Sequence, residues 1–171
     1  MNNKVYLISG VSFFIIILAM ILIYYKQNCV SDIYKEYQYP NEDFFGKELY
    51  SEIDYKCSEY ELEIANMVID RAKEVSDYID IMENAESKLG DVGALSRYYY
   101  FNSENAVMQD VNFQIVTCKI NSDEGHVWVV YNLVRYDKEG EPINSCSDIL
   151  TLWNIEKYGD EWRVVQVREA P

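Results

Sequence analysis

The sequence contains a single histidine, His126, among its 171 residues, and this scarcity excludes a metal site or an acid–base pair built on several histidines. We interpret His126 as an exposed residue at the start of a strand. The four cysteines include no C-x-x-C pair, which argues against thiol redox catalysis and against zinc. The sequence also lacks a nucleophile elbow, a phosphate-binding glycine loop and a dinucleotide fingerprint. We therefore expect no catalytic residues, no metal and no cofactor.

Positive charge is also scarce, because 15 Lys and Arg residues face 29 Asp and Glu residues and the formal net charge is -14. Lys4 and Lys26 are the only charged side chains among the first thirty residues, so every acidic residue lies beyond them. An acidic surface repels phosphate backbones and anionic headgroups, which excludes nucleic acid as a partner. Net charge also keeps a domain soluble, so it does not by itself identify a partner.

One long apolar run is present, Val5–Tyr25, and it carries no charge. At about 1.5 Å per residue a helix of this length spans about 31 Å, which matches a bilayer core of about 30 Å. The apolar region of a cleaved signal peptide is shorter, about 7–15 residues, and no small-x-small cleavage pattern follows the run. We expect a short head of residues 1–4 and an uncleaved single-pass anchor of residues 5–25. The positive-inside rule slightly favours a cell-membrane protein with an extracytoplasmic C-terminal domain.

Residues 26–57 are polar and rich in tyrosine, and Pro40 and Gly46 interrupt them. We interpret them as a tether with room for one short helix over Asp43–Ile53. The folded domain is expected over residues 58–171.

Ser58 and Glu61 form an S-x-x-E capping box, which predicts the start of a helix. Apolar residues recur behind it at helical spacing, so we expect one face of this helix to be buried. The helix is expected to reach about Met82, or to bend and continue to Leu89 before Gly90.

From Asn112 onward the apolar residues recur with a period of two. Four β-rich runs, "NFQIVTCKI", "HVWVVYNLVRY", "SDILTLWNIE" and "EWRVVQVRE", are separated by the turn-prone segments "NSDEG", "DKEGEPIN" and "KYGD". Short loops between successive strands predict an antiparallel meander. Because helices precede strands, we expect an α+β fold with helices packed on a curled antiparallel sheet.

The last two runs form a predicted hairpin. A four-residue "KYGD" loop places Ile155 opposite Trp162 and Trp153 opposite Val164, with both tryptophans on one face. The opposite face of the hairpin is apolar as well, so both faces must be covered. Helices would cover one face, and a sharp curl of the sheet or a partner would cover the other. These four residues, Trp153, Ile155, Trp162 and Val164, are our candidates for an interface.

The helical half followed by strands ending in "WNIEKYGDEWRV" resembles the nuclear transport factor two-like superfamily, also called cystatin-like. The resemblance covers residues 58–171 and implies a cone-shaped sheet with a pocket at its mouth. The superfamily includes isomerases, dehydratases, hydrolases and membrane-tethered domains of bacterial machines, so the resemblance does not supply a function. No motif here matches the acid–base residues of its enzymes.

The candidate pocket-lining residues are Tyr98, Tyr99 and Tyr100, in "RYYYF", and Trp128. Tyrosine hydroxyls serve as general acids in some enzymes. The commoner role of such tyrosines is to pack a helix against a sheet.

If the domain is exported, Cys29, Cys57, Cys118 and Cys146 allow three disulfide pairings. The meander places Cys118 and Cys146 two strands apart, about 9.5 Å. A disulfide needs Cα atoms within about 7 Å, so this pair is disfavoured.

We expect a membrane-anchored domain that binds a partner protein or a small ligand at the cell envelope without catalysis. A second copy of the chain, paired through the sheet, is one such partner. The alternative is an enzyme of the same cone fold, of isomerase, dehydratase or hydrolase type, acting on a small apolar substrate.

Overall fold

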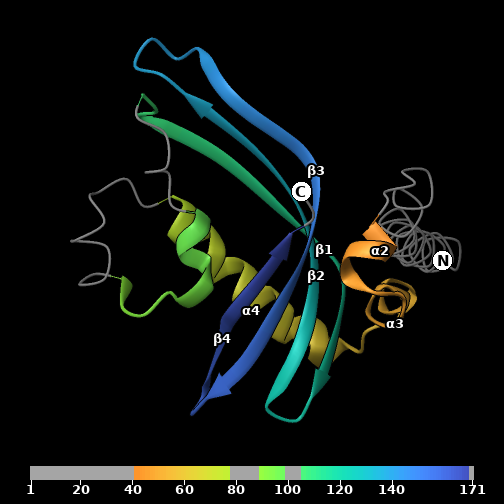
Figure 1. Ribbon diagram of the computed structural model, residues 1–171. Helices are drawn as coiled ribbons and strands as arrows, with labels where there is room; N and C mark the ends of the chain where they lie inside the picture. Colours follow the sequence, from red (N-terminus) through yellow and green to blue (C-terminus); the bar gives the residue numbers. More distant parts are fainter. Residues whose placement is uncertain (1–40, 78–88, 99–104, 170–171) are drawn as a thin grey trace, which may run out of the picture. The chain divides into compact units, whose positions relative to one another are not determined.

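The computed structural model describes residues 41–77, 89–98 and 105–169 (Figure 1). Contacts divide the chain into two units, Met1–Tyr39 and Pro40–Pro171, and every described residue lies in the second unit. The predicted head and anchor, residues 1–25, therefore lie outside the described residues. Among the residues that are described, no helix is both long and apolar enough to cross a bilayer.

Helical elements precede strands along the described chain. They are α2 (Asn41–Phe45), α3 (Lys47–Tyr50), η1 (Ser51–Asp54), α4 (Glu59–Ser76), η2 (Gly93–Tyr98), β1 (Met108–Asn121), β2 (Glu124–Tyr136), β3 (Pro142–Tyr158) and β4 (Glu161–Glu169). The strands form one antiparallel sheet in the order β1-β2-β3-β4. The predicted α+β class and the predicted meander are confirmed.

Helix α4 begins at the predicted capping box. The Ser58 Oγ accepts the Glu61 N–H at 3.3 Å, and the Glu61 carboxylate accepts the Ser58 N–H at 2.7 Å, so both halves of the box are formed. The helix then buries one stripe of its surface: Ile64, Ala65, Val68, Ile69, Ala72 and Val75. The predicted continuation to Met82 or Leu89 crosses residues 78–88, which lie outside the described part of the chain.

One face of the sheet packs against α4 and η2 (Figure 1). The side chains that fill this core come from all four strands: Phe113 and Cys118 from β1, Val127, Val129, Tyr131 and Leu133 from β2, Trp153 and Ile155 from β3, and Val164 from β4. Trp153 is fully buried there, and its Nε1–H donates to the Tyr98 hydroxyl at 3.2 Å. The indole polar atom is thus satisfied inside the core.

The opposite face is covered by α2 and α3 (Figure 1). The Phe45 ring meets the fully buried Trp128 ring edge-on, with centroids 4.8 Å apart, and Tyr50 meets the same ring at 6.1 Å. Arg168 of β4 stacks on Phe45 at 5.6 Å from its centroid. Residues 41–54, which the sequence analysis assigned to the tether, are therefore packed on the sheet as part of the compact unit.

The register of the terminal hairpin differs from the predicted one. The loop consists of Gly159 and Asp160, so Lys157 faces Trp162 and Ile155 faces Val164. Gly159 adopts φ 64, a conformation that two-residue hairpin loops commonly require and that glycine adopts without strain. An irregularity after Ile155 then brings Trp153 opposite Val167. The predicted pairs were wrong because the loop is shorter than four residues.

Both hairpin tryptophans nevertheless belong to the α4-facing side of the sheet. Trp153 is part of the core cluster, and Trp162 packs against that cluster while remaining partly exposed. The predicted sharing of one face by Trp153 and Trp162 is confirmed, because a register shift of two residues preserves the face.

Candidate functional site

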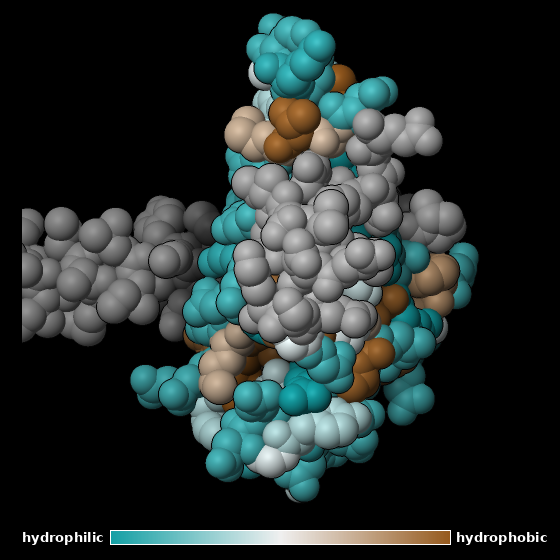
Figure 2. Space-filling model, turned by 90° about the vertical axis from the view of Figure 1, so that its left-hand side faces the viewer, coloured by the Kyte–Doolittle hydropathy of each residue, from teal (hydrophilic) through white to brown (hydrophobic). Residues whose placement is uncertain are grey.

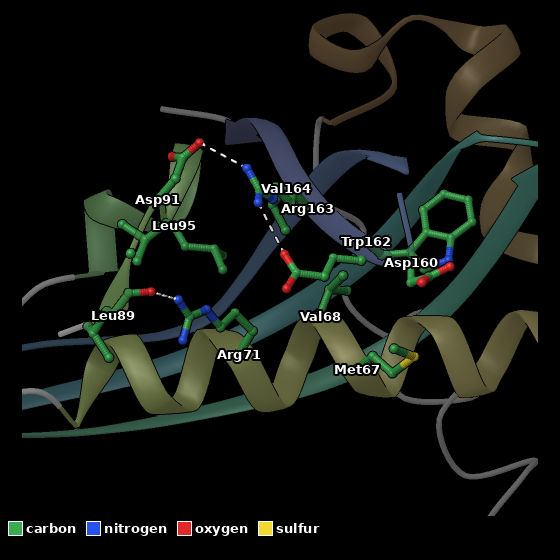
Figure 3. Close-up of a pocket in the computed structure, with 13 residues that line it drawn as sticks. Met67, Val68, Arg71, Leu89, Asp91, Leu95, Asp160, Trp162, Arg163 and Val164 are labelled. Atoms are coloured by element: carbon green, nitrogen blue, oxygen red, sulfur yellow. Dashed lines mark hydrogen bonds and ion pairs between the residues drawn. The ribbon is translucent and has the colours of Figure 1, made fainter. Parts of the chain in front are cut away.

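A groove opens between α4, the stretch 89–95 and the start of β4 (Figure 3). Its volume is about 470 Å³, within the range of ligand pockets, about 300–1,000 Å³. It is lined by Met67, Val68, Arg71, Leu89, Gly90, Asp91, Val92, Leu95, Asp160, Glu161, Trp162, Arg163 and Val164.

The floor of the groove is apolar and belongs to the core. Val68, Leu95 and Val164 are each almost fully buried. Toward solvent, the groove continues over Met67, which is 49% exposed, and over the partly buried Trp162. A methionine and a tryptophan at an open margin suit the binding of an apolar side chain, because both present large, adaptable contact surfaces.

The rim is charged, and its two arginines are already paired. Arg163 lies between Asp91 at 3.2 Å and Glu161 at 3.1 Å, and Arg71 binds the Leu89 carbonyl (Figure 3). Arg71 also binds Glu74. Exposed pairs of this kind stabilise a fold by only about 0–1 kcal/mol, so they are easily rearranged. Among the lining residues three carboxylates accompany two arginines, so the rim favours a cationic neighbour.

Gly93 sets the position of the wall that carries Asp91 and Leu95. Gly93 has φ 54, and a Cβ built on it would lie 2.7 Å from the Val164 carbonyl oxygen. The Gly93 N–H donates to the Asp91 Oδ1 at 3.0 Å. A residue with a side chain would push this wall away from β4, so the glycine is required for the close approach.

A second cavity, of about 350 Å³, is lined by three titratable side chains that contact one another: Glu52, Lys119 and His126. Glu52 of η1 binds the His126 Nδ1 at 2.9 Å and the Lys119 Nζ at 3.0 Å. Burial raises the pKa of Glu52, but the hydrogen bonds from His126 and Lys119 outweigh it and hold this pKa below its usual value. The hydrogen bond with Glu52 also raises the pKa of Lys119. Sequence reasoning missed this cluster, because Glu52 lies in the segment interpreted as a tether.

Of the four predicted pocket residues, the two that the structure describes, Tyr98 and Trp128, line neither of these cavities. Tyr98 is almost fully buried against Phe113, Tyr131 and Trp153, and burial raises the pKa of its hydroxyl. Trp128 is fully buried on the other face of the sheet. Tyr99 and Tyr100 lie outside the described residues. Tyr98 therefore packs η2 against the sheet, the commoner of the two roles expected from the sequence.

The four predicted interface residues divide between the core and the groove. The structure buries Trp153, Ile155 and Val164 beneath α4 and η2. Trp162 and Val164 line the groove, and Trp162 is the one that stays partly exposed. Because α4 and η2 pack on one sheet face and α2 and α3 on the other, these side chains do not form an open apolar surface.

Within the described residues, no group of three His, Cys, Asp or Glu side chains is arranged to hold a metal ion. No protein-family model matches the sequence, and no curated protein matches it. The interpretation of the groove therefore depends on its own geometry and chemistry.

Proposed function

We propose that this chain is a single-pass membrane protein of the cell envelope whose folded domain binds a partner protein in the groove between α4 and β4, without catalysis. The uncharged run of residues 5–25 supports the anchor. The larger of the two cavities described above supports the binding role. The orientation favoured by the positive-inside rule places the domain outside the cytoplasm.

The observation that carries this proposal is the open margin of the groove. Its buried floor continues directly into Met67 and Trp162, so an apolar side chain of a partner can reach core residues without unfolding the domain. On the face that Figure 2 presents, the described surface shows small apolar areas separated by hydrophilic ones. A small recess of this kind suits one or two anchor side chains rather than a broad flat interface.

The charge of the chain defines the chemistry of the partner. The formal net charge is -14, and Asp91, Asp160 and Glu161 stand on the groove rim. We propose that the partner segment carries an apolar side chain flanked by Lys or Arg residues. Electrostatic attraction then accelerates the encounter and selects against acidic partners.

The architecture also supports the proposed resemblance to the nuclear transport factor two-like superfamily. A long helix, a short helical segment and a four-stranded antiparallel sheet follow one another in the order that this resemblance implies. The packing of α2 and α3 on the second sheet face removes the need for a sheet-mediated homodimer to cover it. We therefore place the partner in the groove rather than on the sheet.

The test compares two methionines of equal exposure at different places. Met67, in the groove, is 49% exposed, and Met108, at the start of β1, is 48% exposed. Proteins that co-purify with the detergent-solubilised wild-type chain are compared with those recovered with Met67→Glu and Met108→Glu. We expect Met67→Glu to lose a basic partner that Met108→Glu and wild type retain, and raised salt to weaken that association. Equal recovery with both variants would contradict the groove as the binding site.

The Glu52–His126 pair favours one other function, an acid–base enzyme of the same fold. A carboxylate that orients an imidazole is a common arrangement for a general base. We prefer the binding function because both Glu52 oxygens are already engaged, one by His126 and one by Lys119. These two contacts hold η1 against β1, through Lys119, and against β2, through His126. Turnover of an activated ester by the purified chain, abolished by His126→Ala, would favour the enzyme instead.

A further inference from the structure

Two cysteines distant in the sequence meet beside the first turn of α4. Cys57 directly precedes the capping residue Ser58, is partly buried and packs against the core cluster that contains the fully buried Cys118 of β1. The Cys118 thiol and the Cys118 backbone N–H lie close enough to the Cys57 sulfur to change its pKa. Both side chains are present as free cysteines.

Hydrogen bonds on both sides hold together the two segments that carry these cysteines. On one side the Thr117 Oγ1 donates to the Tyr55 carbonyl at 2.6 Å. On the other side the Ile120 N–H donates to the Glu61 Oε1 at 3.0 Å. One cysteine lies between Tyr55 and Glu61 and the other between Thr117 and Ile120, so the two backbone segments are fixed in register around the sulfur pair.

The two thiols differ in acidity in a way that suits thiol–disulfide exchange. The neighbouring Cys118 thiol lowers the pKa of Cys57 to about 6, and this effect exceeds the opposing effect of burial. The hydrogen bond with Cys57 and burial both raise the pKa of Cys118. Cys57, the partly exposed member of the pair, is thus the more acidic thiol and the nucleophile, and the buried Cys118 is the less acidic one.

We propose that Cys57 and Cys118 are a redox-responsive pair that closes into a disulfide between the start of α4 and β1. The oxidant is a small disulfide such as glutathione disulfide. The Cys57 thiolate attacks one sulfur of the oxidant, which forms a mixed disulfide and releases one glutathione thiolate. The Cys118 sulfur then attacks the Cys57 sulfur, its proton passes to solvent, and the second glutathione leaves. Two protein thiols are oxidised and one glutathione disulfide is reduced to two glutathione thiols.

This bond links the segment that covers the second sheet face to the core of the domain. Residues 41–54 lie immediately before Cys57 and pack on Trp128. Closing a long loop restricts the unfolded chain, so the oxidised domain is expected to be more stable than the reduced one. The inference concerns the redox chemistry of the domain and does not depend on the binding groove.

The test uses the full chain in detergent with Cys29→Ser and Cys146→Ser, which leaves the proposed pair. The protein is equilibrated in glutathione buffers of graded potential, quenched with acid and N-ethylmaleimide, and digested for mass spectrometry. We expect a cross-linked peptide joining Cys57 to Cys118, and a melting temperature about 5–15 °C higher than that of the reduced protein. Two alkylated thiols at every potential, with no cross-linked peptide, would overturn the proposal.

Variants of Cys118 test whether the pKa of Cys57 depends on a donor at position 118 or only on packing there. The rate of Cys57 alkylation against pH should show a midpoint near 6 in the reduced chain with intact cysteines. Cys118→Ser keeps a donor and should keep this low midpoint, whereas Cys118→Val fills the core without a donor and should move the midpoint toward an ordinary thiol, about 8.5. Cys146, a partly buried thiol on β3, provides the comparison within the same molecule. A Cys57 midpoint that is unchanged in Cys118→Val would overturn the proposed pairing of the thiols.

Discussion

Replacing Phe45 by Ala tests whether the segment before α4 is part of the folded domain. The Phe45 ring is 3% exposed and stands edge-on to Trp128. Truncation of a buried phenylalanine costs about 3–5 kcal/mol, because transfer energy is lost and a cavity remains. A typical domain has only about 5–15 kcal/mol of stability, so Phe45→Ala should remove a large share of it.

The neighbouring Phe44 supplies a matched control. Phe44 has the same side chain on the same helix but is 41% exposed. Phe44→Ala should therefore cost under about 1 kcal/mol, the usual range for substitutions away from the core. Both variants lose one aromatic ring, so the difference between their free energies of unfolding measures the effect of burying the Phe45 ring on the sheet.

Urea denaturation, followed by tryptophan fluorescence, measures the free energy of unfolding of the compact unit Pro40–Pro171 in the Phe45→Ala and Phe44→Ala variants. An early exposure of Trp128 would appear as a separate transition, which near-ultraviolet circular dichroism also reports. We expect the midpoint of Phe45→Ala to fall well below those of wild type and Phe44→Ala. Equal and small effects of the two substitutions would refute the packing of α2 on the second sheet face.

Three further predictions concern the cap, the groove wall and the anchor. Burial raises the pKa of Glu61, but hydrogen bonds from Ile120 and Ser58 outweigh it and hold this pKa below its usual value. The contribution of the Glu61 carboxylate to the free energy of unfolding is therefore complete above about pH 4.3, and it is lost as pH falls through the lowered pKa. Glu61→Gln should cost about 1–3 kcal/mol at pH 7 in urea titrations, with a smaller difference at pH 3. Gly93→Ala should destabilise the domain more than Gly90→Ala, since both glycines have positive φ but only the Cβ at position 93 meets a carbonyl; equal melting temperatures would contradict this. The mature chain should keep its N-terminus and stay in membranes after an alkaline wash, and mass spectrometry showing a chain that begins after Lys26 would contradict the anchor.

The elements that the sequence predicted well are those fixed by local chemistry. The capping box needs only Ser58 and Glu61 three residues apart, and the structure forms both of its hydrogen bonds. The strands follow from alternation and turn residues, and the structure joins them as a meander. Local rules act over a few residues, so a single sequence is enough to apply them.

The elements that were missed depend on contacts between distant residues. Phe45 carries no periodic pattern of its own, because a five-residue helix is too short to show one, and its burial requires Trp128 far along the chain. The Glu52–His126 pair has the same origin. Each partner is unremarkable in the sequence, and only the packing of η1 on the sheet brings them together.

The covering of both sheet faces changes the kind of interaction that the domain can make. An apolar hairpin with one open face would bury that face against a partner over a broad area. Here the chain's own helices bury Trp128 on one face and Trp153 on the other, so these central side chains of the sheet are not open to a partner. Exposed apolar area remains at the groove, where Met67 and Trp162 lie next to the core and beside carboxylates. A partner that uses this groove must therefore bring its own apolar anchor, and its affinity will depend on that side chain and on neighbouring positive charge.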